Sequence, residues 1–145
     1  IWATDSNNVR DGRHLMLQKP KEQKKRKPNK KRIENMLDHA WSEFVHKRDK
    51  FCQKCGGRGG LQAHHAFGRR NTATRWDVEN GVLLCHPHHH YWAHRDSAGF
   101  AWWFANKIGE AQYMRLAEAH VQIYKPSIDE LSQKLNALNE MIGQL

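Results

Sequence analysis

The residues best suited to chemistry lie in one stretch of the chain, between Cys52 and His94, which holds all three cysteines and seven of the eleven histidines. Cys52 and Cys55 form one pair with two residues between its members, and Cys85 and His88 form another. This spacing lets both side chains of a turn bind one ion, and four sulfur and nitrogen ligands suit tetrahedral zinc. A site closed by four protein ligands has no open position for a substrate, so we predict a structural zinc.

Two alternatives accompany this assignment. His86, His89 and His90 are also close enough in the sequence to supply the fourth ligand, and His88 is preferred because it repeats the spacing of the first pair. Free cysteines beside incidental histidines are the other interpretation, and the two matching pairs argue against it. An odd number of cysteines in ligand spacing fits a reducing compartment better than a disulfide framework.

Histidines near the zinc ligands remain available for a second site: the pair His64 and His65, and His89 further along the chain. A neutral imidazole, with an unperturbed pKa of about 6.5, can take a proton from water or bind a divalent ion. Phosphodiester hydrolysis needs both a base and a cation that neutralises charge on the phosphate and the leaving oxygen. His90 and His94, one turn apart on an expected helix, are left outside this site as surface histidines.

Local sequence patterns predict the elements that position these side chains. Residues 61–67 are expected to form a short strand, residues 81–84 its partner, and Pro87 suits the first turn of a helix over 87–94. A strand histidine would then face a helix histidine across one cleft. The order strand, long loop, strand, helix predicts an α+β fold with a small core, which zinc would stabilise directly.

Helices are expected to flank this core. Apolar residues at helical spacing predict an amphipathic helix over 31–48. Asp96 or Ser97 can cap a further helix, which Gly109 interrupts before a second helical run over 110–124.

The last helix is expected to open with a capping box formed by Ser127 and Glu130. Its apolar residues follow alternating steps of three and four, which is the spacing of a helix-pairing seam. We favour packing of this seam on its own domain, and a homodimer through the C-terminal helix stays open. The seam consists of Ile128, Leu131, Leu135, Leu138, Ile142 and Leu145.

Positive charge is concentrated toward the N-terminus. Residues 1–50 carry 14 lysines and arginines against 7 acidic residues, in a chain whose net charge is +9. Nine of the fourteen residues over 19–32 are basic, which predicts a disordered, self-repelling arm. DNA is the expected partner, because neutralised phosphates release counterions; a solvated tail or a nuclear-import signal is the alternative. The candidate DNA contacts in the arm are Lys24, Lys25, Arg26 and Lys27.

The sequence offers no sign of a membrane partner. It has no apolar run of the roughly 18 residues that a bilayer span needs, and its first residues lack the apolar segment of a secretory signal. We therefore expect a cytoplasmic protein.

The pattern of His65, Asn80 and His89, framed by the two ligand pairs, resembles the HNH endonucleases, which have the ββα-metal fold. Within that family, HHAFGRRNTATRWDVENGVLLC is similar to phage recombination nucleases of the NinG/Rap kind, as are WSEFVHKRDKFCQKCG before it and WWFANKIGEAQYMRL after it. The resemblance covers about residues 34–118. It implies a metal-dependent DNA endonuclease, acting on branched recombination intermediates of a phage in its bacterial host, that leaves 5′-phosphate and 3′-hydroxyl ends.

By position, the resemblance implies that His65 is the general base, that Asn80 holds the loop so that this base is aimed, and that His89 binds the catalytic ion. His64 stands where many HNH enzymes have an aspartate ligand, although NinG-like relatives also lack aspartate there. Imidazole in place of carboxylate would shift the preference from Mg²⁺ toward Mn²⁺, Ni²⁺ or Zn²⁺. His88 stands in place of the usual fourth cysteine, which zinc tolerates.

Three arginines, Arg69, Arg70 and Arg75, lie in the loop between the two expected strands. The guanidinium fork suits phosphate, so all three are candidate DNA contacts. The alternative pairs one of them with Asp77 or Glu79. We expect Arg69 and Arg70 to reach DNA, and Arg75 to be partly structural through Asp77 and the neighbouring tryptophan.

The chain is thus divided into a basic, largely disordered arm (1–32), an HNH nuclease domain with flanking helices (33–124) and a C-terminal amphipathic helix (125–145). The competing interpretation is a non-catalytic zinc-ribbon DNA-binding module. Such a module would not need histidines beyond its four zinc ligands, and this surplus favours the enzyme.

Overall fold

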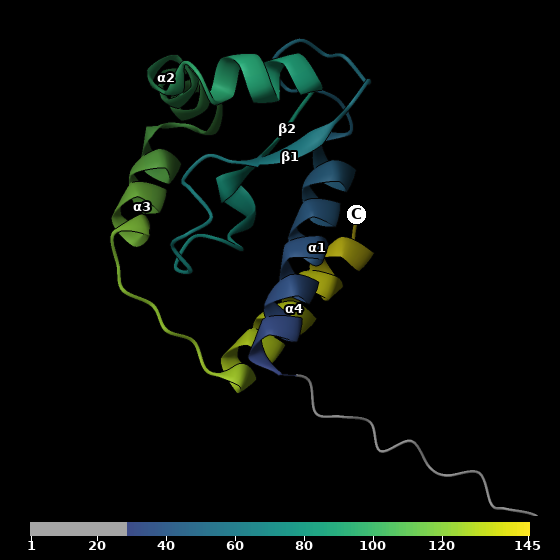
Figure 1. The fold of residues 1–145 in the computed structure, drawn as a ribbon, viewed down its shortest axis with the longest axis vertical. Helices are drawn as coiled ribbons and strands as arrows, with labels where there is room; N and C mark the ends of the chain where they lie inside the picture. Colours follow the sequence, from purple (N-terminus) through teal and green to yellow (C-terminus); the bar gives the residue numbers. More distant parts are fainter. Residues whose placement is uncertain (1–28) are drawn as a thin grey trace, which may run out of the picture.

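The structure is a computed structural model that describes residues 29–145 (Figure 1). Helices surround a sheet of two antiparallel strands, so the expected α+β class is confirmed. Residues 1–28 of the basic arm, with its four candidate DNA contacts, lie outside the described residues. In chain order the elements are α1 (Lys30–Asp49), β1 (Gln62–His65), η1 (Val78–Asn80), β2 (Gly81–Leu84), η2 (His88–Ala93), α2 (Ser97–Ile108), α3 (Glu110–His120) and α4 (Ile128–Gly143).

The amphipathic helix expected over 31–48 is α1. The side chain of Asn29 caps its first turn by accepting a hydrogen bond from the Arg32 amide at 2.9 Å, and the helix ends at Lys50 with a positive φ of 66°. Because it begins at Lys30, the last three residues of the expected arm are helical. Its apolar stripe is buried and consists of Ile33, Leu37, Ala40, Trp41, Phe44 and Val45.

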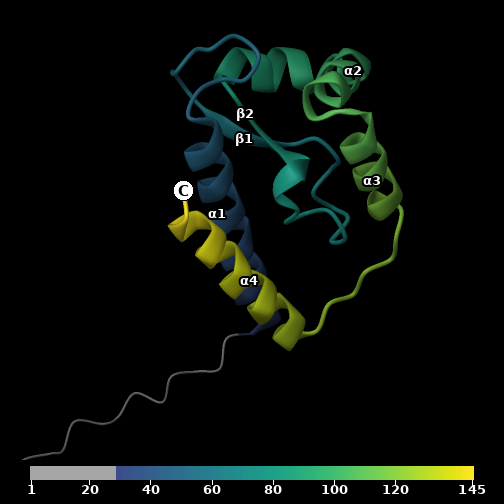
Figure 2. The same ribbon diagram turned by 180° about the vertical axis from the view of Figure 1, so that it is seen from behind.

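The last helix, α4, packs along α1 and runs in the same direction (Figures 1 and 2). The predicted capping box between Ser127 and Glu130 is present, and the Lys30 ammonium donates to the Pro126 carbonyl at 2.8 Å where the two helices begin. Four seam residues are buried in one cluster with the α1 stripe, so the seam packs on its own chain. A homodimer through the C-terminal helix stays a prediction. The buried seam residues are Leu131, Leu135, Leu138 and Ile142.

The hairpin has the predicted antiparallel pairing, and β2 separates two apolar cores. Leu83 belongs to the cluster of α1 and α4, whereas its neighbours Val82 and Leu84 belong to a second cluster with α2 and α3. Alternating side chains of a strand point to opposite faces, which explains this division. The first strand is shorter than predicted because the amides of Ala66 and Phe67 bond to Asn80, at 2.9 and 2.6 Å, rather than to β2.

After β2 the chain forms a helical layer over one face of the sheet (Figure 1). The segment expected as an ordinary helix over 87–94 contains a π-helical turn, η2. Asp96 caps α2, and Gly109, with a φ of 90°, separates α2 from α3 as expected. The second helical run stops at residue 120 instead of 124. Loop side chains bond to backbone carbonyls at and after its end: Asn71 donates to the His120 carbonyl and Thr72 to the Tyr124 carbonyl.

None of the helices in residues 29–145 combines the length and apolarity required to cross a lipid bilayer.

Candidate functional site

The four predicted zinc ligands come together at one end of the sheet, with donor atoms all within 4.8 Å of one another. Zinc–sulfur bonds of about 2.3 Å and zinc–nitrogen bonds of about 2.0–2.1 Å imply tetrahedral edges of about 3.8 Å between sulfurs and 3.6 Å between sulfur and nitrogen. The Sγ atoms of Cys55 and Cys85 lie 3.8 Å apart, and the His88 Nδ1 lies 3.7 Å from the Cys52 Sγ and 3.2 Å from the Cys85 Sγ. The cluster is compatible with a structural zinc.

The backbone around Cys52 favours the thiolate that a metal requires. The Gly56 and Cys52 amides close the turn by donating to the Cys52 and Gly57 carbonyls, at 2.7 and 2.8 Å. Burial alone would raise the pKa of the Cys52 thiol, but backbone N–H groups of Cys85, Cys55 and Lys54 outweigh burial and lower the pKa to about 6. A thiolate at neutral pH is the form that binds zinc.

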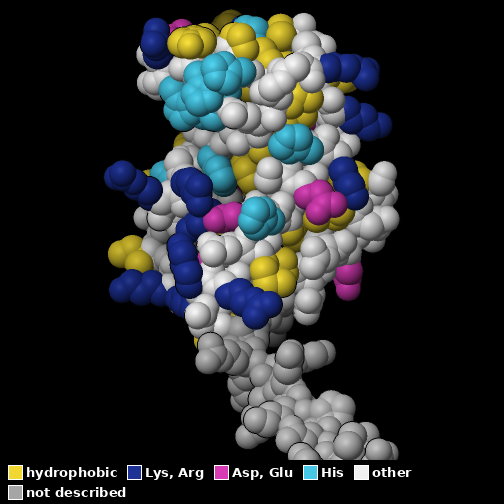
Figure 3. All heavy atoms as spheres, turned by 45° about the vertical axis from the view of Figure 1, so that its right-hand side comes forward, with side chains coloured by type: hydrophobic (Ala, Val, Ile, Leu, Met, Phe, Trp, Pro, Cys, Tyr) yellow, Lys and Arg dark blue, Asp and Glu magenta, His cyan; other side chains and the backbone are white. Residues whose placement is uncertain are grey.

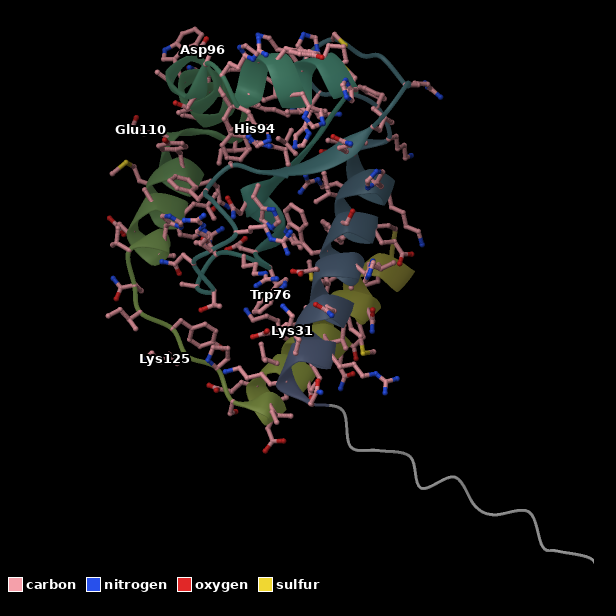
Figure 4. All side chains as sticks on the ribbon, in the orientation of Figure 1. Lys31, Trp76, His94, Asp96, Glu110 and Lys125 are labelled. Carbon is pink, nitrogen blue, oxygen red and sulfur yellow. The ribbon has the colours of Figure 1, made fainter. Side chains whose placement is uncertain are left out.

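A second cluster holds three histidines, His64, His89 and His94, again with donor atoms within 4.8 Å of one another. The Nε2 atoms of His89 and His94 are 3.3 Å apart, which matches the edge of about 3.3–3.4 Å that two imidazoles share on a tetrahedral ion. The Nδ1 of His89 is buried without a hydrogen-bond partner in the described residues. In Figure 4, His94 lies next to β1 on the sheet side of the helical layer. These donors fit a divalent ion that accepts imidazole ligands.

The π-helical turn brings the two helix histidines together. Residues five apart diverge on an α-helix, but a π-helix has i→i+5 hydrogen bonds, so His89 and His94 share a face of η2. We predicted His94 to be a surface histidine outside the site; its side chain is indeed exposed, but its ring nitrogen lies within 4.8 Å of the donors of His64 and His89, so it joins the candidate ligands. That prediction grouped His90 with His94 on α-helical spacing. The one sequence signal for a third ligand was the presence of more histidines than the zinc cluster needs.

His64 and His89 are held in the uncharged form that can bind an ion. Burial, followed by repulsion from the other histidines, lowers the pKa of His64 to about 3. Burial and the neighbouring histidines, with His94 first among them, lower the pKa of His89 to about 4. Near pH 7 both rings carry a free lone pair, and neither adds positive charge that would repel a cation.

His65 follows His64 in β1, and the alternation of the strand turns it to the opposite face. Its ring stacks on Trp41 of α1, and its Nε2 lies 2.8 Å from the Arg75 carbonyl. A carbonyl can only accept, so Nε2 carries the proton and Nδ1 presents a lone pair. Burial lowers the pKa of His65, outweighing the opposite effect of the hydrogen bond to Arg75, so the ring is neutral at pH 7.

Asn80 is fully buried and fastens the loop between the strands. Its Oδ1 accepts from the Phe67 amide at 2.6 Å, and its Nδ2 donates to the carbonyls of Phe67 at 2.9 Å and Thr74 at 3.0 Å. Thr74 precedes Arg75, whose carbonyl accepts the hydrogen bond from the His65 Nε2–H. Asn80 thus fixes the backbone that orients His65, and the catalytic role that the resemblance implies for the pair stays a prediction.

The loop arginines do not all have the predicted partners. Arg75 pairs with Asp38 of α1 through two hydrogen bonds, at 2.9 and 2.5 Å, and not with Asp77 as expected. Asp77 pairs instead with Arg115 of α3 at 2.8 Å. With 13% of its side chain exposed and its guanidinium over the Trp76 ring, Arg75 has little surface for the candidate DNA contact. The reason is a contact between distant segments that no local pattern reveals.

Arg69 and Arg70 remain accessible. Arg69 also reaches Asp38, at 3.0 Å, but 61% of its side chain is exposed. Arg70 is exposed and makes no ion pair with any residue over 29–145. Both therefore keep the surface that a phosphate contact requires.

These groups line one open cleft of about 860 Å³. In Figure 3, histidine side chains cluster near the upper edge of the molecule, and lysines and arginines lie across the same face below them. Among the lining residues is His120 of α3, which the sequence analysis did not single out. The cleft is lined by Ala63, His64, His65, Gly68, Arg69, Arg70, Asn71, His89, His94 and His120.

Comparison with protein families, curated proteins and solved structures finds no match for this chain. The function must therefore be argued from the cleft itself.

Proposed function

We propose that this protein is a metal-dependent DNA endonuclease of the HNH type, which hydrolyses phosphodiester bonds. One observation carries the proposal: a three-histidine cluster and an oriented fourth histidine, His65, line the same cleft beneath exposed arginines. A purely structural metal site would need only its three histidine ligands. The additional oriented base is what hydrolysis requires.

His65 is the proposed general base. Its Nδ1 lone pair takes a proton from water, the water oxygen attacks the scissile phosphorus in line, and the bond to the 3′ oxygen breaks. The products carry 5′-phosphate and 3′-hydroxyl ends. The carbonyl of Arg75 keeps the proton on Nε2, and Trp41 holds the plane of the ring, so the base needs no reorientation before reaction.

The ligands of the catalytic ion are His64, His89 and His94. A bound divalent cation would neutralise charge on the phosphate and on the leaving oxygen. Because the cluster contains no carboxylate, we expect Mn²⁺, Ni²⁺ or Zn²⁺ to support activity better than Mg²⁺.

The resemblance to HNH nucleases supports the choice of DNA as substrate. The motif residues His65, Asn80 and His89 come from β1, the end of η1 and η2, an order of strand, loop, strand and helix that suits a ββα-metal core. Exposed arginines on the rim suit a polyanion. Branched recombination intermediates, cut in the cytoplasm of a bacterial host, are the substrates that the NinG/Rap likeness suggests.

A gel assay tests the proposal. Linear, nicked and four-way-junction DNA are incubated with the zinc-loaded protein in EDTA, Mg²⁺ or Mn²⁺, and His65→Ala is compared with wild type. Cleavage that needs the metal and falls at least about a hundredfold in His65→Ala is expected, since general bases contribute about 10²–10⁴ in rate. His39→Ala, at an exposed histidine of α1 outside the cleft, is the matched control. Wild-type cleavage by His65→Ala would contradict the proposal.

A non-catalytic zinc-ribbon DNA-binding module is the second candidate. The tetrahedral spacing of the Cys52, Cys55, Cys85 and His88 donors favours it, because that cluster needs no catalysis to explain it. It predicts DNA binding without cleavage in every metal tested.

A further inference from the structure

The cleft is larger than one reacting phosphodiester requires. Its volume of about 860 Å³ lies near the upper end of the roughly 300–1,000 Å³ typical of ligand pockets. The histidine cluster and His65 account for one part of its lining. The rest comes from Ala63 of β1, from the loop 68–71 and from His120, which belongs to α3, outside the hairpin.

His120 is held in position by the loop. Its Nδ1 lies 3.0 Å from the hydroxyl of Thr74, a fully buried residue, and its ring contacts Phe67. Asn71 donates to the His120 carbonyl and so fastens the end of α3 to the same loop. When the Thr74 hydroxyl donates to Nδ1, the ring carries its proton on Nε2, and a protonated ring also donates from Nε2.

Arg70 adds positive charge to the cleft that His120 lines. It is exposed, has no ion pair among residues 29–145, and lines both the cleft and a groove that continues over the chain between α3 and α4. In Figure 4 that connecting chain, marked by Lys125, lies on the far side of the loop from Trp76 and α1. Lys125 lines the same groove. A nucleic-acid strand leaving the cleft over Arg70 would therefore pass a basic surface.

We propose that His120 and Arg70 form a subsite for a phosphate that flanks the cleaved bond. The ligand is the pair of non-bridging oxygens of a neighbouring phosphodiester, bound by the His120 Nε2–H and by the Arg70 guanidinium. The subsite rests on the proposed nuclease function and names a substrate requirement: at least one phosphate beyond the reacting one. A positioned imidazole in the same cleft as an arginine that has no ion pair among residues 29–145 suits phosphate, since charge-assisted hydrogen bonds to phosphate gain from both.

Cleavage of two substrates tests the subsite. Bis(4-nitrophenyl) phosphate has one diester and no flanking phosphate, whereas an oligonucleotide has several. The variants His120→Asn and Arg70→Gln should cut DNA about tenfold more slowly and the small diester at a rate within about twofold of wild type. An equal loss on both substrates, or no loss on DNA, would overturn the subsite.

Two variants at His120 separate a contact from a structural role. Asparagine places its amide near the position of Nδ1 and so keeps a partner for Thr74, whereas glutamine reaches the position of Nε2. We expect His120→Gln to recover part of the DNA activity that His120→Asn loses, with similar unfolding midpoints for both. The controls are His39→Asn and Arg58→Gln, at exposed residues that do not line the cleft.

Binding to DNA tests the subsite independently of catalysis. Wild type that hydrolyses neither substrate would refute the nuclease function, and fluorescence anisotropy with a labelled oligonucleotide would then decide the phosphate contact. His120→Asn and Arg70→Gln should bind about tenfold more weakly. Arg70→Gln should also reduce the slope of log K against log salt by about 0.7–0.9. Binding equal to wild type in both variants would overturn the subsite.

Discussion

The imidazole of His65 lies flat against the indole of Trp41, with ring centroids 3.7 Å apart and planes inclined by 8°. Trp41 is buried, and its Nε1 donates to the Asp77 carbonyl at 2.9 Å, so the surface under His65 is fixed to the loop as well as to α1. The proposed base is thus held by a stack on one side and by a carbonyl on the other.

Gly81 is the first residue of β2, and the Trp41 ring occupies the space that a side chain at this position would need. A Cβ at this position would lie 2.6 Å from a ring carbon of Trp41 and 2.6 Å from a methyl of Val45. Gly81→Ala should therefore lower the free energy of unfolding by about 1–3 kcal/mol through overpacking. Urea unfolding of wild type and variant measures this difference in the free energy of unfolding. Gly59→Ala, where an added Cβ meets nothing within 4 Å, is the control and should differ little from wild type.

Asn80 should be intolerant of substitution. Asn80→Ala removes three side-chain hydrogen bonds in a fully buried place and leaves the Phe67 amide and the Thr74 carbonyl without these partners. The expected loss is about 2–4 kcal/mol in the free energy of unfolding. Asn80→Asp should be at least as damaging, because it buries a charge and loses both amide donors. A stable Asn80→Ala protein would show that the loop holds its shape without this residue.

Removal of the zinc ion that we expect at Cys52, Cys55, Cys85 and His88 should unfold the hairpin end of the protein. Cys52 and Cys85 are buried in the apolar core of α2 and α3, so loss of the ion would remove the bonds that hold the two sulfurs together and would leave the Cys52 thiolate unpaired inside that core. His88→Ala should lower the tightly bound zinc, measured by atomic emission, and reduce the melting temperature. His90→Ala, at an exposed histidine on the same segment, should leave both unchanged. Equal zinc content in His88→Ala and wild type would exclude His88 as a ligand.

Much of this site could be predicted from local sequence. The spacing of Cys52, Cys55, Cys85 and His88 predicted a cluster, because two ligands with two residues between them converge on one ion. The hairpin and the capping box of α4 followed from short-range patterns as well.

What the sequence did not reveal depends on contacts between distant segments or on an unusual turn. Arg75 finds Asp38 across 37 positions, and His120 reaches the cleft from a helix outside the motif. His94 joins the cluster because η2 is π-helical, whereas the expected α-helical spacing grouped it with His90 outside the site. None of these follows from a residue's immediate neighbours.

The membership of His94 in the second cluster can be measured directly. His94→Ala should weaken binding of Ni²⁺ or Co²⁺ to the zinc-loaded protein by about 10- to 100-fold, because one of three ligands is lost. Isothermal titration calorimetry provides the affinity. His90→Ala is the matched control, since its ring lies on the same segment but outside the cluster. A larger effect from His90→Ala would mean that the segment is α-helical in solution.

Asp38 should stabilise the fold through its carboxylate at every pH above its depressed folded-state pKa. Burial alone would raise the pKa of Asp38, but hydrogen bonds from Arg75 and Trp76 and the charges of Arg75 and Arg69 outweigh burial and lower the pKa below its usual 3.8. A carboxylate with a depressed pKa contributes fully above its unfolded pKa and loses that contribution only as the pH falls through the folded value. Asp38→Asn should therefore cost about 1–3 kcal/mol in the free energy of unfolding.

That cost should stay constant between about pH 5 and pH 8, since Asp38 is ionised in both the folded and the unfolded chain throughout this range. Urea unfolding of wild type and Asp38→Asn at several pH values gives the difference. A difference that shrinks toward pH 5 would contradict the depressed pKa. Glu43→Gln is the control, because its exposed ion pair with Lys47 on the same helix should contribute little at any pH.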